Sequence, residues 1–104
     1  MSGFAERVAG GLRLVVLQLL ASAAKEGVAE VNDGILRSSA CEFGPRPDPG
    51  RFAAALDWLA AEKLITLREA GDFRVASLTE LGADVAAGRV TVIGVRRPDR
   101  QPDA

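Results

Sequence analysis

The stretch Leu56-Asp57-Trp58-Leu59-Ala60-Ala61-Glu62-Lys63-Leu64-Ile65 decides the fold of this chain. Its first half continues a helical pattern, whereas Leu64 and Ile65 open a β-prone run, so a helix passes directly into a strand. A second β-prone run, residues 73–78, follows Glu69-Ala70-Gly71-Asp72. Because turn-forming residues between two such runs are typical of a hairpin, the stretch predicts a helix that leads straight into a β-hairpin.

The first of three helices predicted before this hairpin runs from about Leu12 to Lys25. Its apolar residues recur at the i, i+3, i+4 spacing of one buried face, and others form a second apolar face. A helix with two apolar faces either lies at the centre of the fold or packs against a partner chain. Residues 3–9 predict only a short helical lead-in, because Gly10-Gly11 weakens a helix at that point.

Two more helices precede the hairpin, and each follows a capping residue. The second is predicted over about Asp33–Phe43, with Asn32 as its N-cap. The third is predicted over about Pro49–Lys63, with Asp48 as N-cap and proline at the first helical position. Because the segment between them is rich in proline, it ends one helix and changes the chain direction before the next.

The chain after the hairpin predicts a fourth, short helix over about Glu80–Ala87, with Thr79 as its N-cap. Val90-Thr91-Val92-Ile93 is β-prone. The length of 104 residues fits one domain. We therefore expect a single domain over residues 1–98, followed by a disordered tail at residues 99–104.

This order of elements predicts a specific architecture. Two helices joined by a turn and followed at once by a β-hairpin form a winged helix-turn-helix, in which the hairpin is the wing. The fold class is α+β and mostly α, with three helices, the wing and a short C-terminal helix. In such a fold the third helix can lie in a major groove about 12 Å wide, while the wing reaches the neighbouring backbone or minor groove.

The run from Leu12 to Val95 resembles winged-helix proteins of the ArsR-like and MarR-like kind, through Leu59-x4-Leu64-Ile65 and Leu78-Thr79-Glu80-x-Gly82. It more closely resembles a group of small proteins encoded by Mu-like bacteriophages and prophages. The motifs that carry this resemblance are Leu56-Asp57-Trp58-Leu59-Ala60, Leu78-Thr79-x2-Gly82-x2-Val85-Ala86-x-Gly88-Arg89 and Val92-x-Gly94-Val95-x-Arg97-Pro98. The resemblance implies the fold and no particular activity. The chain departs from the usual pattern in its proline-rich turn, Glu42–Pro49.

The composition argues against catalysis. The chain has no histidine, no tyrosine and a single cysteine, so it has neither a Cys/His zinc site nor a Ser-His or Cys-His nucleophile pair. No glycine-rich phosphate loop follows a predicted strand. We therefore expect a protein that is not an enzyme and that holds no metal or cofactor.

The same composition favours the cytoplasm. One cysteine forms no internal disulfide, which is typical of a reducing compartment. The longest apolar run, Leu12–Ala24, is interrupted by polar residues and is shorter than a membrane-spanning segment. It also lacks the flanks of a secretory signal. We therefore expect a cytoplasmic protein without a membrane partner.

Several residues of the third helix and the wing are candidates for contact with double-stranded DNA. Arg51 lies in the first helical turn, where base contacts are usually made, and Arg46 precedes the helix, within reach of a phosphate. Small residues on the same helix allow a close approach, and arginines flank the wing tip. The predicted DNA-binding residues are Arg46, Gly50, Arg51, Ala54, Ala55, Arg68 and Arg74.

Acidic residues support a rival interpretation. Asp57 and Glu62 share the third helix and would repel phosphate, and the wing arginines can pair across the strands with Glu69 or Asp72. The net charge of −1 also fits poorly with non-specific DNA binding. The rival is a winged-helix module that binds another protein and no nucleic acid, and a remoter one is a phage structural or accessory protein. A positive stripe along the four arginines would favour DNA, whereas a neutral or acidic helix face would favour a protein partner.

A homodimer is the expected assembly. The doubly apolar first helix suggests an interface, and the predicted interface residues are Phe4, Val8, Leu14 and Leu17. Two other residues have a structural and a functional interpretation. Trp58 is either a core residue beneath the hairpin or an exposed anchor, and Cys41 is either a buried residue or a redox sensor. We expect the core role for both.

Overall fold

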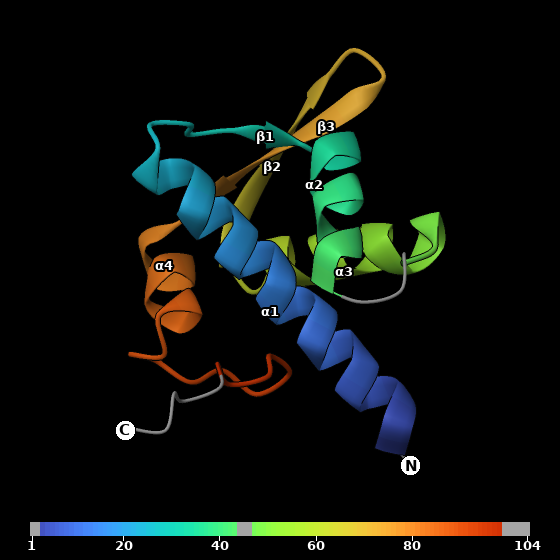
Figure 1. Ribbon diagram of the computed structural model, residues 1–104, viewed down its shortest axis with the longest axis vertical. Helices are drawn as coiled ribbons and strands as arrows, with labels where there is room; N and C mark the ends of the chain where they lie inside the picture. Colours follow the sequence, from blue (N-terminus) through green and yellow to red (C-terminus); the bar gives the residue numbers. More distant parts are fainter. Residues whose placement is uncertain (1–2, 44–46, 99–104) are drawn as a thin grey trace.

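The computed structural model describes residues 3–43 and 47–98. It is a mostly helical α+β fold in which helices are followed by a β-hairpin and a short C-terminal helix, the order of a winged helix (Figure 1). The predicted fold class is therefore confirmed. The elements are α1 (Gly3–Lys25), β1 (Val31–Asn32), α2 (Asp33–Ala40), the 3-10 helix η1 (Cys41–Phe43), α3 (Pro49–Ala61), β2 (Ile65–Ala70), β3 (Phe73–Leu78) and α4 (Glu80–Ala86).

The capping residues act as predicted. The side chain of Asn32 accepts a hydrogen bond from the backbone nitrogen of Ile35 at 2.8 Å, at the start of α2. Asp48 does the same for Arg51 at 2.9 Å, at the start of α3. A side-chain oxygen that satisfies one free N–H of the first turn fixes where a helix begins. Both helices accordingly begin at the predicted residues.

A Schellman motif makes the direct passage from α3 into β2. The helix ends at Ala61, and Lys63 adopts a left-handed conformation with φ of 65°. The nitrogen of Leu64 donates to the oxygen of Leu59 at 3.0 Å, and the nitrogen of Lys63 donates to the oxygen of Ala60 at 3.0 Å. Leu59 and Leu64 are both fully buried, as the hydrophobic contact of this motif requires. The chain reverses within two residues, so the strand begins immediately.

The first helix is longer than predicted. The structure has one continuous helix from Gly3 to Lys25, and Gly10 lies in its interior. This glycine is buried, and the C-terminal segment packs against it. The nitrogen of Arg96 donates to the oxygen of Gly10 at 3.2 Å, and a Cβ at Gly10 would lie 3.4 Å from the oxygen of Gly94. The prediction that the helix begins only at about Leu12 was wrong, because Gly10 allows close packing between α1 and the C-terminal segment.

α1 is the central helix of the fold and contacts α2, α3, α4 and β3 (Figure 1). At 23 residues it is also the one described helix that is long and apolar enough to cross a bilayer, by length and composition alone. The expectation that its apolar run is too short is therefore corrected. A core helix passes the same test, and α1 contributes to the core cluster, whose buried residues include Leu14, Val16, Leu17, Leu20, Leu36, Phe52, Leu56, Leu59, Leu64, Ile65 and Val85.

The sheet contains a strand that the sequence pattern missed. β1 has only two residues, Val31 and Asn32, and pairs antiparallel with β3 opposite Ala76 and Val75. The strand order is β1-β3-β2, with the hairpin strands antiparallel. Two residues are too few for an alternating pattern, so no periodic signal was present.

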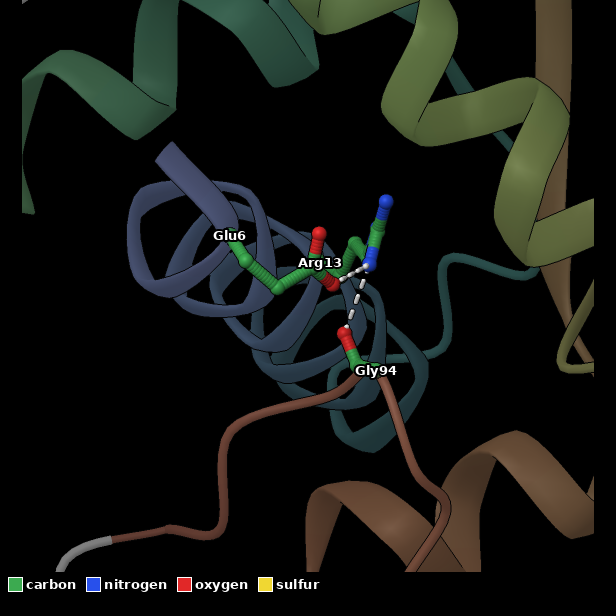
Figure 2. A network of polar contacts seen from close by, with 3 residues as sticks. All are labelled: Glu6, Arg13 and Gly94. Atoms are coloured by element: carbon green, nitrogen blue, oxygen red, sulfur yellow. Dashed lines mark hydrogen bonds and ion pairs between the residues drawn. The ribbon is translucent and has the colours of Figure 1, made fainter. Parts of the chain in front are cut away.

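The segment after α4 is not a strand, although Val90-Thr91-Val92-Ile93 is β-prone. It runs back along α1 instead, and Val95 is buried in the core. Figure 2 shows Arg13 of α1 pointing between the carboxylate of Glu6 and the carbonyl of Gly94. One guanidinium nitrogen donates to Gly94 at 2.8 Å and lies 3.3 Å from the Glu6 carboxylate. These contacts hold the C-terminal segment on the helix.

Trp58 packs at the same place. It is partly buried against the core, and the guanidinium carbon of Arg13 lies 4.1 Å from the centre of its ring, in a cation–π contact. A Cβ on Gly94 would collide with the ring. The core role is confirmed, and the ring packs against Arg13 of α1 and against Gly94 of the C-terminal segment.

Candidate nucleic-acid interface

The solvent face of α3 carries three of the predicted residues. Gly50, Arg51 and Ala54 are exposed along the first two turns, and 73% of the Arg51 side chain is accessible. The Arg51 guanidinium lies 3.5 Å from the carboxylate of Asp48, the capping residue. An exposed pair of this kind contributes little to stability and leaves the arginine available to a ligand.

Ala55 is not part of this face. It is only 5% exposed and packs inward with Phe52, Leu56 and Leu59, which form the buried side of α3. The prediction that Ala55 contacts DNA is therefore wrong. Residue 55 points about 100° away from residue 54 on a helix, and this rotation turns Ala55 towards the buried side.

The wing is a tight hairpin that follows α3 in the chain and projects past α2 at the top of Figure 1. Its first strand continues to Ala70, two residues further than predicted, and its second strand begins at Phe73 as predicted, so the turn contains only Gly71 and Asp72. Gly71 has φ of +64°, a conformation that suits glycine at the first position of a II′ turn. The register places Glu69 opposite Arg74 and Arg68 opposite Val75.

Arg74 pairs with an acidic residue of α3 and not with Asp72 of the turn. One of its guanidinium nitrogens donates to the carboxylate of Asp57 at 2.6 Å, although Glu69 lies directly across the strand. Only 28% of the Arg74 side chain is exposed, compared with 64% of the Asp57 side chain. The pair ties the wing to the middle of α3, and the arginine is neither free nor fully accessible.

Arg68 pairs with Glu30, which lies just before β1. Two guanidinium nitrogens donate to the two carboxylate oxygens at 2.9 Å and 2.7 Å, a bidentate geometry. The hydrogen bonds from Arg68 hold the pKa of the Glu30 carboxyl below its ordinary value. Glu30 was not among the predicted residues. Its role depends on the pairing of β1 with β3, which brings Glu30 near the hairpin, and the sequence pattern does not show that pairing.

The stretch of chain that carries this face is acidic overall. Residues 30–74 contain eight acidic and six basic residues. Among the predicted arginines, Arg51, Arg68 and Arg74 each lie beside a carboxylate, whereas Arg46 lies outside the described residues. The three predicted arginines that the structure describes, Arg51, Arg68 and Arg74, therefore do not form an unopposed positive stripe.

The predicted dimer residues separate into two groups. Phe4 is 80% exposed and Val8 is 40% exposed, so both are available to a partner. Leu14 is 3% exposed and Leu17 is fully buried in the chain's own core. The prediction for these two leucines is corrected, because the second apolar face of α1 is used by α2, α3 and α4 within one chain.

Comparison with known proteins relates the chain to a phage protein. It is 36% identical over 86 residues to "Uncharacterized protein gp26" of Escherichia phage Mu, and the match covers 83% of this chain and 85% of the phage protein. The chain belongs to the gp26 family of phage Mu. No protein-family model matches it, and no solved structure matches it.

Metal-binding groups and a free thiol are the other chemical features to place in this gp26-family protein. In the part of the chain that the structure describes, no group of three or more metal-binding side chains comes together. Cys41 is a free, partly buried thiol whose sulfur donates to the oxygen of Arg37 at 3.5 Å. The outer face of α3 and the wing present small and charged groups to solvent.

The Arg68–Glu30 pair makes this gp26-family protein sensitive to acid in a defined direction. A carboxyl with a lowered pKa in the folded state adds stability above its unfolded pKa, and this stability is lost as the pH falls through the folded pKa. We expect an NMR titration to show Glu30 protonating at lower pH than it does in the Arg68→Gln variant. An unchanged Glu30 titration in that variant would contradict the pairing.

Proposed function

We propose that this chain is a winged-helix DNA-binding protein, a phage or prophage regulator that acts in the cytoplasm. One observation supports this most strongly. The first two turns of α3 present Gly50, Arg51 and Ala54 to solvent, and the hairpin that follows α3 projects from the fold. In helix-turn-helix proteins the first turns of the motif's second helix, which corresponds to α3 here, contact base edges, and the wing contacts the flanking backbone.

Small side chains on the outer face allow this helix to approach a groove closely. Gly50 and Ala54 lie on either side of Arg51 along the helix, so the guanidinium is the longest group on this stretch. An arginine in this position can donate two hydrogen bonds to a guanine edge or hold a phosphate. Arg51 therefore has the central role in the proposed interface.

The ion pairs limit what the wing can add. Phosphate would have to displace Asp57 from Arg74 and Glu30 from Arg68 before either arginine bound it fully. We therefore expect few phosphate contacts and weak non-specific binding, which depends on released counterions. Affinity would come from sequence-specific contacts at α3 more than from charge.

The test is selection of a duplex from a random DNA library, followed by binding measurements at two salt concentrations. We expect Arg51→Ala to weaken binding roughly tenfold and to reduce the salt slope by about one. Arg89→Ala is the matched control, because Arg89 is also an exposed arginine, 64% accessible, paired with a nearby aspartate, and it lies after α4, away from the proposed interface. This control should bind as the unmodified chain does.

A second candidate function rests on the acidic balance of the same face. The excess of acidic over basic residues in residues 30–74, with Arg68 and Arg74 both paired, suits a partner protein with basic groups. If no duplex is enriched and binding to DNA does not respond to salt, the DNA proposal fails and this alternative is favoured.

A further inference from the structure

The outer face of α1 is an apolar surface that its own chain leaves partly uncovered. Phe4, Val8, Val15 and Leu19 lie within a narrow angle of one another on a helix of 3.6 residues per turn. Phe4 and Val8 are exposed, and Val15 and Leu19 are only partly buried. In Figure 1 no other element passes in front of α1, and its N-terminal end projects beyond the rest of the fold.

A groove opens beside the far end of this face. It lies between α1, β1, α2 and β3 and has a volume of about 490 Å³. Val28, 46% exposed, and Ile35, 57% exposed, stand at its edge. Its apolar lining includes Leu19, Ala23, Val28, Val31, Ile35 and Leu36. One chain thus has a projecting aromatic side chain at one end of α1 and an apolar groove at the other end.

We propose that two copies of this chain pair through the outer faces of α1, with the helices antiparallel and the two-fold axis near Gly11. In this arrangement Phe4 of one copy lies over the section from Val15 to Leu19 of the other, at the mouth of the groove. The two-fold symmetry makes both contacts at once, as a closed dimer requires. The proposal does not depend on DNA binding.

The helix dipoles favour this antiparallel arrangement over a parallel one. The positive N-terminal end of each helix dipole lies beside the C-terminal half of the other helix, where a parallel pair would align like ends. A parallel pair would also place Phe4 against Phe4 on the projecting ends and leave both grooves open. Two charged side chains lie beside this face. In the antiparallel pair Arg7 approaches the uncharged Gln18 of the other copy, whereas the guanidinium of Arg96 lies close to Gly11, near the axis.

The assembly is tested by sedimentation equilibrium of the full chain. We expect a dimer, and we expect Phe4→Glu to raise the dimer dissociation constant about 30-fold, the effect of removing an aromatic anchor from an interface. Ile93→Glu is the matched control, because Ile93 is 97% exposed but lies in the segment after α4. Its dissociation constant should not change. Circular dichroism confirms that each variant is folded.

Crosslinking tests the antiparallel orientation. In a Cys41→Ser background, Gly11→Cys places the thiols of two copies close to the axis, and an added Cβ at Gly11 has only the Arg96 side chain near it, at 3.8 Å. Phe4→Cys places the thiols roughly 20 Å apart along the helices. A short bismaleimide should therefore join two Gly11→Cys chains and leave Phe4→Cys chains single.

Three results would overturn the proposal. A monomer at concentrations of tens of micromolar would show that no second copy covers α1. Efficient crosslinking of Phe4→Cys with none at Gly11→Cys would show a parallel pair. Binding of the chain to phospholipid vesicles, abolished by Phe4→Glu and accompanied by a monomer in solution, would assign the face to a membrane.

Discussion

Gly82→Ala is expected to cost about 3 kcal/mol or more of folding stability, a large share of what a domain of this size has. A Cβ at this position would overlap the backbone oxygen of Leu64 and lie 2.9 Å from a methyl group of Leu78. The backbone oxygen cannot move freely, because it accepts hydrogen bonds from the nitrogen of Thr79 at 3.2 Å and from its hydroxyl at 3.0 Å. Relief of the overlap therefore requires α4 to shift away from the start of the hairpin.

Chemical denaturation, monitored by the fluorescence of the single tryptophan, measures this loss of folding stability. Gly11→Ala is the control, because it adds the same methyl group to a glycine in the interior of a helix, where the nearest side-chain atom is 3.8 Å away. Alanine is the better helix former, so this variant should be as stable as the original or more stable. Equal stability of the two variants would show that α4 does not pack on Leu64 as described.

The sequence predicted those parts of the fold that depend on local chemistry. Asn32, Asp48 and Thr79 each cap a helix at the predicted position, because capping involves a side chain and an N–H only three residues away. The hairpin also followed from local signals, a glycine turn between two β-prone runs. The order of these elements then allowed few arrangements other than the winged helix.

The missed features depend on contacts between distant parts of the chain. Gly10 was predicted to weaken a helix, and only the packed C-terminal segment explains why the helix continues. The β-prone run at residues 90–93 likewise forms no strand, because Val90 and Val92 pack against the core instead. Intrinsic preferences were overridden by tertiary packing in both places.

The candidate interface was predicted in position but not in charge. Gly50, Arg51 and Ala54 lie exposed on α3, as expected from the helix-turn-helix order. The partners of the wing arginines were not foreseen, because Glu30 is 38 residues from Arg68 and Asp57 is 17 residues from Arg74. The sequence order of charges shows neither pair, and both pairs lower the positive charge available to DNA.

Leu17→Ala is expected to destabilise the fold by about 2–5 kcal/mol, the usual effect of removing a fully buried leucine side chain. Leu17 is fully buried where α1 meets the other helices, so the substitution leaves a cavity within one chain. The urea midpoint should therefore fall at every protein concentration. A loss of stability that disappeared at high protein concentration would instead assign Leu17 to a contact between two chains.

Val8→Ala separates the two roles that one apolar helix can have. Val8 is 40% exposed and lies in the second turn of α1, so its truncation should leave the stability of one chain within about 0.5 kcal/mol. Its effect should appear only in the dimer dissociation constant. Together, Leu17→Ala and Val8→Ala test whether the two faces of α1 have different roles, with Leu17 in the core of one chain and Val8 in the contact between two chains. If both variants lowered the midpoint equally at all concentrations, α1 would be a core helix over its whole surface, and the homodimer would need another interface.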